Sequence, residues 1–472
     1  MHSGKFTKII ATLGPSSSDE KVIKELITSG VNLFRFNLKH ADMAWHVRHI
    51  KKVREVSEKL GISTGIIIDI RGPECVVSIP SASEIKLKKN DLLRVCVVNS
   101  ECSGEKDILL SPDEIPGLID DGDVLVVDDG KIELRAERSE KGLFLKAAET
   151  GVLKTGKGVS FTNKKISVPT INPQEKEVIK ELIKMSPDFF ALSFVRNHKD
   201  VENLSEFLLD NGSKAGIISK IETQEGIDDL DLIVGKSDGI MVARGDLGVE
   251  VSLEKITYYQ KRIIEKCRAS AKPVIVATQM LESMTTNPSP TRAEVSDISN
   301  AVRDGTDAVM LSGETAIGKY PVESVRFMHK IVSFNEKALR VPAALEFSED
   351  RTFSIVKAAV DIIKSDNGRS LSKILVATET GKTARIFSSF RPEIPIIALT
   401  QNLDTLKKLG LSYGVLPNMI DFPEHGLVDV TEIAHILLKR GILSKGENII
   451  VVHGKRWQDP GNTNSLYIFN VN

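Results

Sequence analysis

Short apolar runs alternate with longer amphipathic stretches through the first two thirds of this chain of 472 residues. Each run is rich in aliphatic side chains, which is typical of a strand buried on both faces of a sheet. The runs lie at residues 7–13, 32–38, 65–70, 189–195, 216–221, 239–242, 273–277 and 308–311. Stretches with helical periodicity lie between them at residues 19–29, 41–60, 174–185, 253–271 and 321–338. This repeated alternation predicts an α/β fold built on a TIM (β/α)8 barrel rather than an open sheet.

The alternation is interrupted once, from about residue 72 to residue 165. Closely spaced strand patterns separated by Gly, Asp and Lys turns predict a small β-barrel domain there, inserted as a lid after the third barrel strand. The alternation then restarts, with helices expected at 354–365, 383–390, 403–410 and 428–440 and strands at 373–378, 396–399, 448–452 and 465–471. We therefore expect a barrel of residues 1–71 and 166–340, an inserted β domain of residues 72–165, and a C-terminal open α/β domain of residues 341–472.

Composition argues against several classes of function. The 63 basic and 64 acidic side chains nearly cancel, so no basic field indicates nucleic acid as a partner. No apolar run is long enough to span a membrane, and the N-terminus lacks a secretory core. The four cysteines form no Cys-x-x-Cys pair. Cys96 and Cys102 could bridge only in an oxidising compartment, and we expect a cytoplasmic protein with reduced thiols.

Polar side chains recur at the carboxyl ends of the predicted barrel strands, where a TIM barrel carries its active site. Lys220 and Glu222 are two residues apart and share one face of their strand. Burying this lysine with Glu222 and Asp246 costs free energy unless the charges are paired or metal-bound. The pattern predicts a divalent cation and an ammonium acting together on an anionic oxygen. A satisfied ion pair between Lys220 and Glu222 is the alternative.

Long barrel motifs resemble the pyruvate kinase family. They comprise residues 7–15, Lys220-Ile221-Glu222, and residues 243–248, 277–284, 290–294 and 310–316. The resemblance extends over the whole chain, including the inserted domain and the C-terminal domain. It implies transfer of the phosphoryl group of phosphoenolpyruvate to ADP, giving pyruvate and ATP in glycolysis. It also implies Mg²⁺ or Mn²⁺ as the cofactor and a homotetramer.

The resemblance implies a role for each charged residue at the strand ends. Glu222 and Asp246 would hold Mg²⁺, because carboxylate oxygens are suitable ligands for this hard cation. Lys220 would neutralise charge on the transferring phosphoryl group and on the developing enolate oxygen. Arg35 would hold the phosphate, because a guanidinium group matches phosphate geometry.

The substrate carboxylate and the enolate proton are expected at neighbouring strand ends. Gly245 lets the backbone come close, so the N–H groups of Gly245 and Asp246 would meet the carboxylate. Thr278, helped by Ser312, would orient that carboxylate and belong to the water relay that protonates the enolate, and Glu314 would order the relay. Taken alone, Thr278 and Ser312 are more typical of strand-end caps.

The segment 290–294 is expected to be structural. Pro290 would lie in the first turn of a helix, and Arg292 and Glu294 would pair across an interface.

The site that binds K⁺ in the family has one altered side-chain ligand in this chain. By resemblance Asn37, Asp69 and the carbonyl of Ile70 would bind K⁺, but Lys39 stands where the family has a serine that ligates the ion. The ammonium would repel K⁺ or take its place beside Asp69. We therefore expect reduced K⁺ dependence, although Glu74 is the residue type associated with K⁺ activation. The alternative is that Lys39 points to solvent and the K⁺ site survives with a water.

The resemblance implies that ADP or ATP binds near Asn37, His40 and Arg71. His40 can also be interpreted as a solvated loop histidine. Arg71 replaces a lysine of the family, and Val76 stands where the family has an arginine near the nucleotide phosphates. A paralogue with altered nucleotide preference is therefore one alternative function. A weakly active regulatory subunit that binds a sugar phosphate is another.

A predicted strand-to-helix loop in the C-terminal domain has the composition of a phosphate-binding cradle. By resemblance it would bind a sugar-phosphate activator, with the loop 455–464 closing over it. A capped helix without a ligand is the alternative. The candidate effector residues are Thr378, Thr380, Gly381, Lys382 and Thr383.

Overall fold

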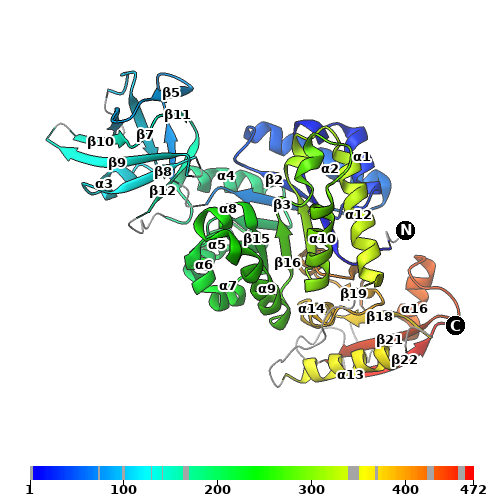
Figure 1. The fold of residues 1–472 in the computed structure, drawn as a ribbon. Helices are drawn as coiled ribbons and strands as arrows, with labels where there is room; N and C mark the ends of the chain where they lie inside the picture. The colour runs from blue at the N-terminus through cyan, green and yellow to red at the C-terminus, as the bar shows by residue number, and fades with distance from the viewer. Residues whose placement is uncertain are drawn as a thin grey trace. The chain divides into compact units, whose positions relative to one another are not determined.

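The computed structural model describes residues 4–72, 75–97, 101–128, 130–140, 142–162, 169–338, 350–366, 370–422, 430–454 and 463–472. Contacts separate two compact units, one of Met1–Ile70 with Val178–Asn472 and the other of Arg71–Glu177. Figure 1 shows both units, with many of their elements labelled. Each unit is built around its own sheets and core.

Eight parallel strands close a barrel in the larger unit. In order round the barrel they are β1 (Lys8–Thr12), β17 (Ala308–Leu311), β16 (Val274–Ala277), β15 (Gly239–Ala243), β14 (Gly216–Ile221), β13 (Phe189–Leu192), β3 (Gly65–Ile70) and β2 (Leu33–Asn37). Alternate side chains of these strands, such as Ile67, Phe189 and Met310, form one buried cluster. The predicted TIM barrel is confirmed.

Helices follow most of the barrel strands (Figure 1). The first long one, α2 (Met43–Leu60), begins where Asp42 accepts a hydrogen bond from the N–H of Trp45 and ends at Gly61, which has a left-handed φ of 64°. The others are η1 (Pro15–Ser17), α1 (Glu20–Thr28), α4 (Pro173–Ile183), α5 (His198–Asp210), α6 (Gln224–Asp228), α7 (Leu230–Lys236), α8 (Arg244–Glu250), α9 (Leu253–Ala269), η2 (Glu282–Thr285), α10 (Arg292–Asp304), α11 (Gly313–Ala316) and α12 (Pro321–Ala338).

The expectation for residues 290–294 needs correction. Helix α10 begins at Arg292, so Pro290 precedes the N-cap residue Thr291 instead of lying in the first turn. Glu294 accepts hydrogen bonds from the backbone N–H of Thr291 and of Ser283, each at 2.7 Å. Thr291 and Glu294 are three residues apart, the spacing of a capping box, and Glu294 also fixes η2 through Ser283.

The smaller unit contains a second closed barrel of β10 (Gly142–Ala147), β6 (Leu92–Cys96), β7 (Asp107–Ser111), β4 (Cys75–Ser78), β12 (Lys157–Phe161), β8 (Val124–Val127) and β9 (Ile132–Ser139). A two-stranded sheet of β5 (Glu84–Leu87) and β11 (Gly151–Lys154) and the short α3 (Ile115–Leu118) accompany it. Inward residues such as Leu93, Leu134 and Leu145 are fully buried. The predicted small β barrel is confirmed.

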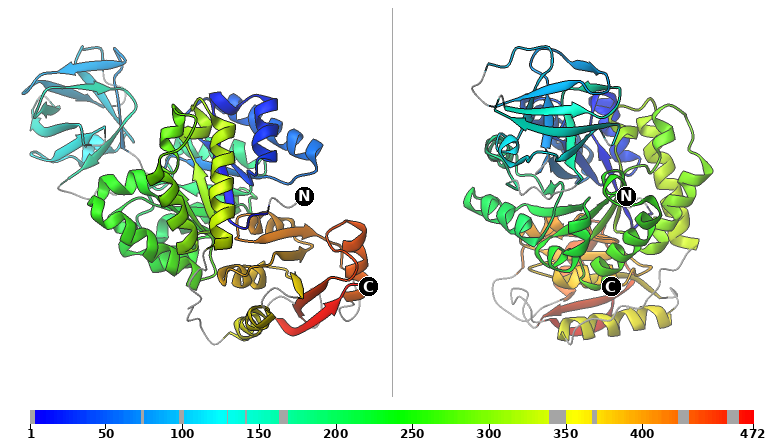
Figure 2. Two further views of the ribbon diagram at one scale, coloured as in Figure 1. Left: turned by 45° about the vertical axis from the view of Figure 1, so that its right-hand side comes forward. Right: turned by 60° about the vertical axis from the view of Figure 1, so that its left-hand side comes forward.

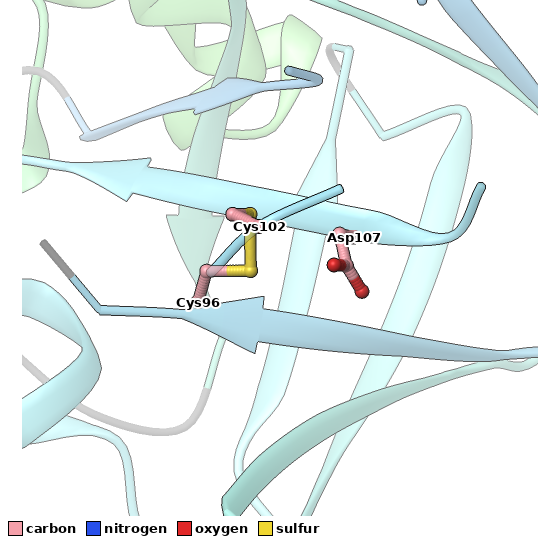
Figure 3. A group of neighbouring side chains, drawn as sticks. All are labelled: Cys96, Cys102 and Asp107. Carbon is pink, nitrogen blue, oxygen red and sulfur yellow. A yellow bond between two sulfur atoms is a disulfide. The ribbon is translucent and has the colours of Figure 1, made fainter. Parts of the chain in front are cut away.

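Two cysteines of this unit are bonded, contrary to the expectation of reduced thiols (Figure 3). The Cα atoms of Cys96 and Cys102 lie 6.0 Å apart, a separation that a disulfide can span. Asp107 lies near the two sulfur atoms, but its carboxylate accepts hydrogen bonds from Arg94 and from the N–H of Gly104. Bonded sulfurs and a paired carboxylate make this cluster a structural staple rather than a metal centre.

The C-terminal part of the larger unit is an open sheet with helices on both faces (Figure 2). The strand order is β20 (Val415–Met419), β19 (Ile396–Thr400), β18 (Leu371–Ala377), β21 (Asn448–Gly454) and β22 (Thr463–Asn470), and β22 is antiparallel to β21. Helices α13 (Arg351–Asp366) and α14 (Lys382–Ser389) pack on one face of the sheet. Helix α16 (Val430–Lys439) packs on the other face, and α15 (Leu403–Leu409) precedes β20.

The sequence pattern missed β20. Pro417 and Asn418 interrupt its apolar run, and β20 lies at the edge of the sheet, where a strand tolerates proline. None of the helices in the described ranges is long and apolar enough to cross a membrane.

Candidate active site

Strand ends of the barrel bring four predicted residues into one buried cluster. They are Arg35 in β2, Asp69 in β3, Lys220 in β14 and Glu222 directly after β14. Nζ of Lys220 lies 3.0 Å from Oε1 of Glu222 and 3.3 Å from Oδ1 of Asp69. Nε of Arg35 donates to Oδ2 of Asp69 at 2.6 Å. No side chain of the four is more than 10% exposed, so their charges interact with little solvent screening.

Burial opposes every charge in this cluster, and pairing decides which charges persist. Burial would raise the pKa of Asp69, but Arg35 and Lys220 outweigh it and hold this pKa below its usual value. Burial likewise opposes the charge on Lys220, yet Asp69 and Glu222 raise the pKa of its ammonium above the usual value. Lys220 is therefore a permanent cation at neutral pH.

Glu222 is the less compensated carboxylate. Burial raises its pKa to about 7, with Lys220 opposing the shift and Asp246 adding to it. Oε2 accepts a hydrogen bond from the N–H of Phe194 at 2.7 Å. Oε1 is buried and has no hydrogen bond within the described part of the chain, although it lies within ion-pair distance of Lys220. A buried oxygen with spare acceptor capacity and an interacting second carboxylate fit the needs of a hard divalent cation.

Asp246 lies in the first turn of α8, half-buried, and its carboxylate makes no hydrogen bond with the described ranges of the chain. Its field raises the pKa of Glu222, so the two carboxylates lie close enough to repel each other. Both predicted metal ligands therefore have oxygens available for an ion.

Thr278, directly after β16, contacts the start of α8. Its Oγ1 accepts from the N–H of Gly245 at 2.8 Å and donates to the carbonyl of Ala277 at 2.6 Å. Thr278 and Gln279 have left-handed φ values of 66° and 55°, which are uncommon outside glycine. A Cβ at Gly245 would meet Thr278 at 3.6 Å, an ordinary contact, so packing within the protein does not by itself require glycine there.

Arg244 holds this strained turn in place. It donates to the carbonyl of Thr278 and to the carboxylate of Asp297, both at 2.6 Å. The strain at Thr278 thus persists because a buried arginine restrains its backbone.

Ser312 and Glu314 follow β17. Glu314 is buried and accepts from the backbone N–H of Ser312 at 2.7 Å and of Leu281 at 2.9 Å. Burial raises the pKa of Glu314 above its usual value, against the opposing effect of these N–H groups. Oγ of Ser312 is buried and has no hydrogen-bond partner in the described residues. Such a hydroxyl can bind a water or a substrate oxygen.

All three predicted K⁺ ligands, Asn37, Asp69 and Ile70, already contact groups of the protein. Ser193, which follows β13, donates to the carbonyl of Ile70 at 2.9 Å and lies 3.2 Å from Oδ1 of Asp69. It also accepts from Lys220 at 2.7 Å. The side chain of Asn37 accepts from the backbone N–H of Lys39 at 3.1 Å.

The ammonium of Lys39 lies over an aromatic ring. Its Nζ is 5.2 Å from the centre of the Phe194 ring, in cation–π geometry. Among the described residues, the cations that contact the oxygens of Asp69 are Arg35 and Lys220. Glu74 lies outside the described residues.

The predicted nucleotide residues lie in both units. Asn37 ends β2, and His40, which is exposed, accepts a hydrogen bond from His46 through its carbonyl at 2.8 Å. Arg71 begins the smaller unit, and Val76 lies in β4.

Three contributors were not assigned a role from the sequence. They are Ser193, Phe194 and Arg244. The expected fourth strand ran to residue 195, so its polar end at Ser193 was hidden inside a run of apolar residues. In the structure β13 ends at Leu192, which pairs with Ile70 of β3. Ser193 and Phe194 therefore lie just beyond the strand end, where active-site residues of a barrel are expected.

Polar groups of the candidate effector loop already have partners within the protein. Oγ1 of Thr378 accepts from the N–H of Gly381 at 3.0 Å, and Gly381 has a left-handed φ of 78°. Lys382 forms an ion pair with Asp350. The buried Thr383 lies 2.9 Å from the hydroxyl of Thr463. The carbonyl of Thr380 accepts from Arg385 at 3.2 Å, and residues 455–462 of the expected closing loop lie outside the described ranges.

Comparison with known proteins gives full-length matches. The family model "Pyruvate kinase, barrel domain" matches residues 4–325, and "Pyruvate kinase, alpha/beta domain" matches residues 354–469. The chain is 39% identical to a pyruvate kinase of Lactobacillus delbrueckii subsp. bulgaricus over 98% of this chain and 80% of that protein. It is 36% identical to one of Agrobacterium vitis over 99% of each.

A solved structure is also similar over nearly all of both chains. The crystal structure of a pyruvate kinase from Cryptosporidium parvum superposes with a TM-score of 0.84 and 30% identity, covering 100% of this chain and 97% of that one. The two family models, the curated relatives and the solved structure agree. This chain belongs to the pyruvate kinase family.

Proposed function

We propose that this chain transfers the phosphoryl group of phosphoenolpyruvate to ADP, giving pyruvate and ATP, with the chemistry centred on Lys220. The observation that supports this assignment is the buried ammonium of Lys220 held between Asp69 and Glu222 at the barrel mouth, with Arg35 beside it. A fixed cation of this kind stabilises charge on a transferring phosphoryl group without reorganisation. Full-length similarity to pyruvate kinases supports the same reaction.

Glu222 and Asp246 would hold a divalent cation, Mg²⁺ or Mn²⁺. When bound, this ion would act as a Lewis acid and a template for substrate oxygens. The buried, under-satisfied Oε1 of Glu222 supports the assignment.

Arg35 and Lys220 would bind the phosphate of phosphoenolpyruvate. Asp69 orients both cations, because its two oxygens contact one of them each. Once the phosphoryl group leaves, Lys220 would stabilise the enolate oxygen.

The strand ends at Thr278 and Ser312 would bind the carboxylate and deliver the enolate proton. Backbone N–H groups of Gly245 and Asp246 would meet the carboxylate, after Gly245 gives up its hydrogen bond to Thr278. The hydroxyl of Ser312, which has no hydrogen-bond partner among the described residues, and the buried Glu314 would order the water that carries the proton.

The proposal extends to the other predictions that come from the family resemblance. ADP would bind at Asn37, His40 and Arg71, and the inserted domain of residues 72–165 would act as a lid on a barrel of residues 1–71 and 166–340. The loop of Thr378, Thr380, Gly381, Lys382 and Thr383 in the domain of residues 341–472 would bind a sugar-phosphate activator. A cytoplasmic homotetramer is the expected form.

Lys39 would reduce the requirement for K⁺. It adds a fixed positive charge at the barrel mouth, and Asp69 and Ile70 already have partners within the protein. We retain Asn37, Asp69 and Ile70 as the residues that would bind K⁺ if the ion is needed.

A coupled assay with phosphoenolpyruvate, ADP and Mg²⁺ tests the function. We expect turnover by the unmodified protein, and a loss on the order of 10³-fold in Lys220→Met, because a preorganised charge is removed from the reacting atoms. Lys214→Met, an exposed lysine before the same strand, is the matched control and should keep full activity. Unchanged turnover in folded Lys220→Met would overturn the role of Lys220.

Comparing ADP, GDP and UDP as phosphoryl acceptors in this assay distinguishes the proposed function from the two alternative functions. A clear preference for another nucleotide would favour the altered paralogue. Absence of turnover with every nucleotide would favour a regulatory subunit.

A further inference from the structure

The turn that follows β13 carries a strained residue beside the candidate metal site. Phe194 has a left-handed φ of 52°, a conformation that costs on the order of 1–3 kcal/mol for a residue with a bulky side chain. Such a conformation persists only where the surroundings impose it.

The backbone of Phe194 fixes Glu222. Its N–H donates to Oε2 at 2.7 Å, and Glu222 is fully buried. This hydrogen bond fixes one carboxylate oxygen, while Oε1, 3.0 Å from Nζ of Lys220, accepts no hydrogen bond from the described residues. Which oxygen Glu222 offers to an ion thus depends on the position of the Phe194 N–H group.

Contacts on both sides pin the turn. Ser193 donates to the carbonyl of Ile70 at 2.9 Å, and Thr223 donates to the carbonyl of Val195 at 3.2 Å. A third restraint acts on Phe194 itself, because the ammonium of Lys39 lies 5.2 Å from the centre of its half-buried ring. This cation–π contact connects the end of β2 to the turn after β13.

We propose that Phe194 is a positioning residue for Glu222 and that Lys39 acts on the metal site by anchoring the Phe194 ring. The inference rests on the proposed function only in taking Glu222 as a metal ligand. It differs from a purely electrostatic role for Lys39. A through-space charge would repel a divalent cation whether or not the ring is present, whereas an anchor needs the ring.

A double-mutant cycle on Mn²⁺ binding separates these two roles. The dissociation constant of Mn²⁺ is measured by electron paramagnetic resonance on the full chain without substrates, for Lys39→Met, Phe194→Leu and the double variant. We expect each single change to weaken Mn²⁺ binding about threefold to tenfold, the range of a partly desolvated cation–π contact. The double variant should bind no more weakly than Phe194→Leu, because the second change removes nothing further.

Conservative variants make the test specific. Lys39→Arg and Phe194→Tyr keep a cation over a ring and should keep the Mn²⁺ affinity of the unmodified protein. Lys199→Met removes an exposed positive charge from α5 and should also leave Mn²⁺ affinity unchanged. If Phe194→Leu does not fold, Lys39→Met is instead measured in the Phe194→Tyr background. The ring remains there, so the loss of the cation must still weaken Mn²⁺ binding.

Three outcomes would overturn the proposal. They are additive effects in the cycle, tighter Mn²⁺ binding in Lys39→Met, and unchanged binding in both single variants. Failure of the proposed function is recognised separately, since it appears as absent turnover in the unmodified protein while Mn²⁺ binding, and its loss in Glu222→Gln, can still be measured.

Discussion

Buried lysines lie at both ends of the barrel, and their surroundings give them opposite properties. At the carboxyl ends of the strands, Lys220 contacts two carboxylates and its pKa is raised. Lys8 lies at the beginning of β1 and donates to the carbonyl of Val415 at 2.7 Å. Burial lowers its pKa to about 8, against the opposing fields of Glu336 and Asp307. Both ammonium groups are buried and both feel nearby carboxylates, but Lys220 forms direct ion pairs with two of them, whereas Lys8 donates to a backbone carbonyl.

Lys8 makes stability depend on pH in a predictable direction. Its pKa is about 8 in the folded chain and 10.5 when unperturbed, so between these values the unfolded chain binds more protons. Stability should therefore rise with pH across this window as far as Lys8 contributes. We expect Lys8→Met to make the slope of unfolding free energy against pH less positive there, measured by urea unfolding. Lys51→Met, an exposed change, should keep the slope, and equal slopes for Lys8→Met and the unmodified chain would contradict the prediction.

Individual elements are positioned by contacts at their ends. Helix α10 is an example, because Glu294 of its capping box also accepts hydrogen bonds from Ser283 in η2. The spacing of Thr291 and Glu294 can be recognised in the sequence as a capping box. The contact with Ser283, eleven residues from Glu294 along the chain, could not be read from that spacing.

Removal of the cap should destabilise the larger unit. We expect Thr291→Ala to lower the unfolding free energy by about 1 kcal/mol, the usual effect of losing an N-cap hydroxyl. Glu294→Ala should cost more, because it also leaves the N–H and hydroxyl of Ser283 without their acceptor. Chemical unfolding measures both values. A larger effect from Thr291→Ala than from Glu294→Ala would show that the capping hydroxyl, not the link to Ser283, dominates.

At the scale of the whole molecule, the barrel mouth gathers side chains from strands that are distant in sequence. Asp69 and Lys220 are 151 residues apart, yet Nζ lies 3.3 Å from Oδ1. The closed strand order places β3 beside β13 and β13 beside β14, which explains this contact. Positive charge at this mouth comes from Arg35, Lys39 and Lys220.

This accumulation of fixed cations predicts weak dependence on K⁺. Replacing K⁺ by tetramethylammonium in the coupled assay should reduce turnover less than several-fold, because Lys39 already supplies a monovalent charge. Lys39→Ser should be more dependent on K⁺ than the unmodified protein. A several-fold loss of activity in tetramethylammonium, equal in both proteins, would contradict the hypothesis.

Local patterns in the sequence are enough to predict the architecture and the residue types of the site. Apolar runs and helical periodicity are local properties, so they predicted all eight barrel strands to within a few residues. The rule that active sites lie at strand carboxyl ends then placed Lys220, Glu222, Asp246 and Thr278 at one mouth. β20 escaped this reasoning because Pro417 breaks its apolar pattern, and an edge position tolerates that break.

The contacts that hold these residues arise from long-range packing in the folded chain. The hydrogen bond from Phe194 to Glu222, the ring beneath Lys39 and the disulfide of Cys96 and Cys102 depend on distances between atoms that no periodicity encodes. The charge state of the site depends on them as well. Burial alone would neutralise Asp69, Lys220 and Glu222. The contacts between β2, β3 and β14 keep Asp69 and Lys220 charged, whereas the pKa of Glu222 stays raised to about 7. Local patterning therefore determines which side chains reach the barrel mouth, and long-range packing determines their ionisation and geometry.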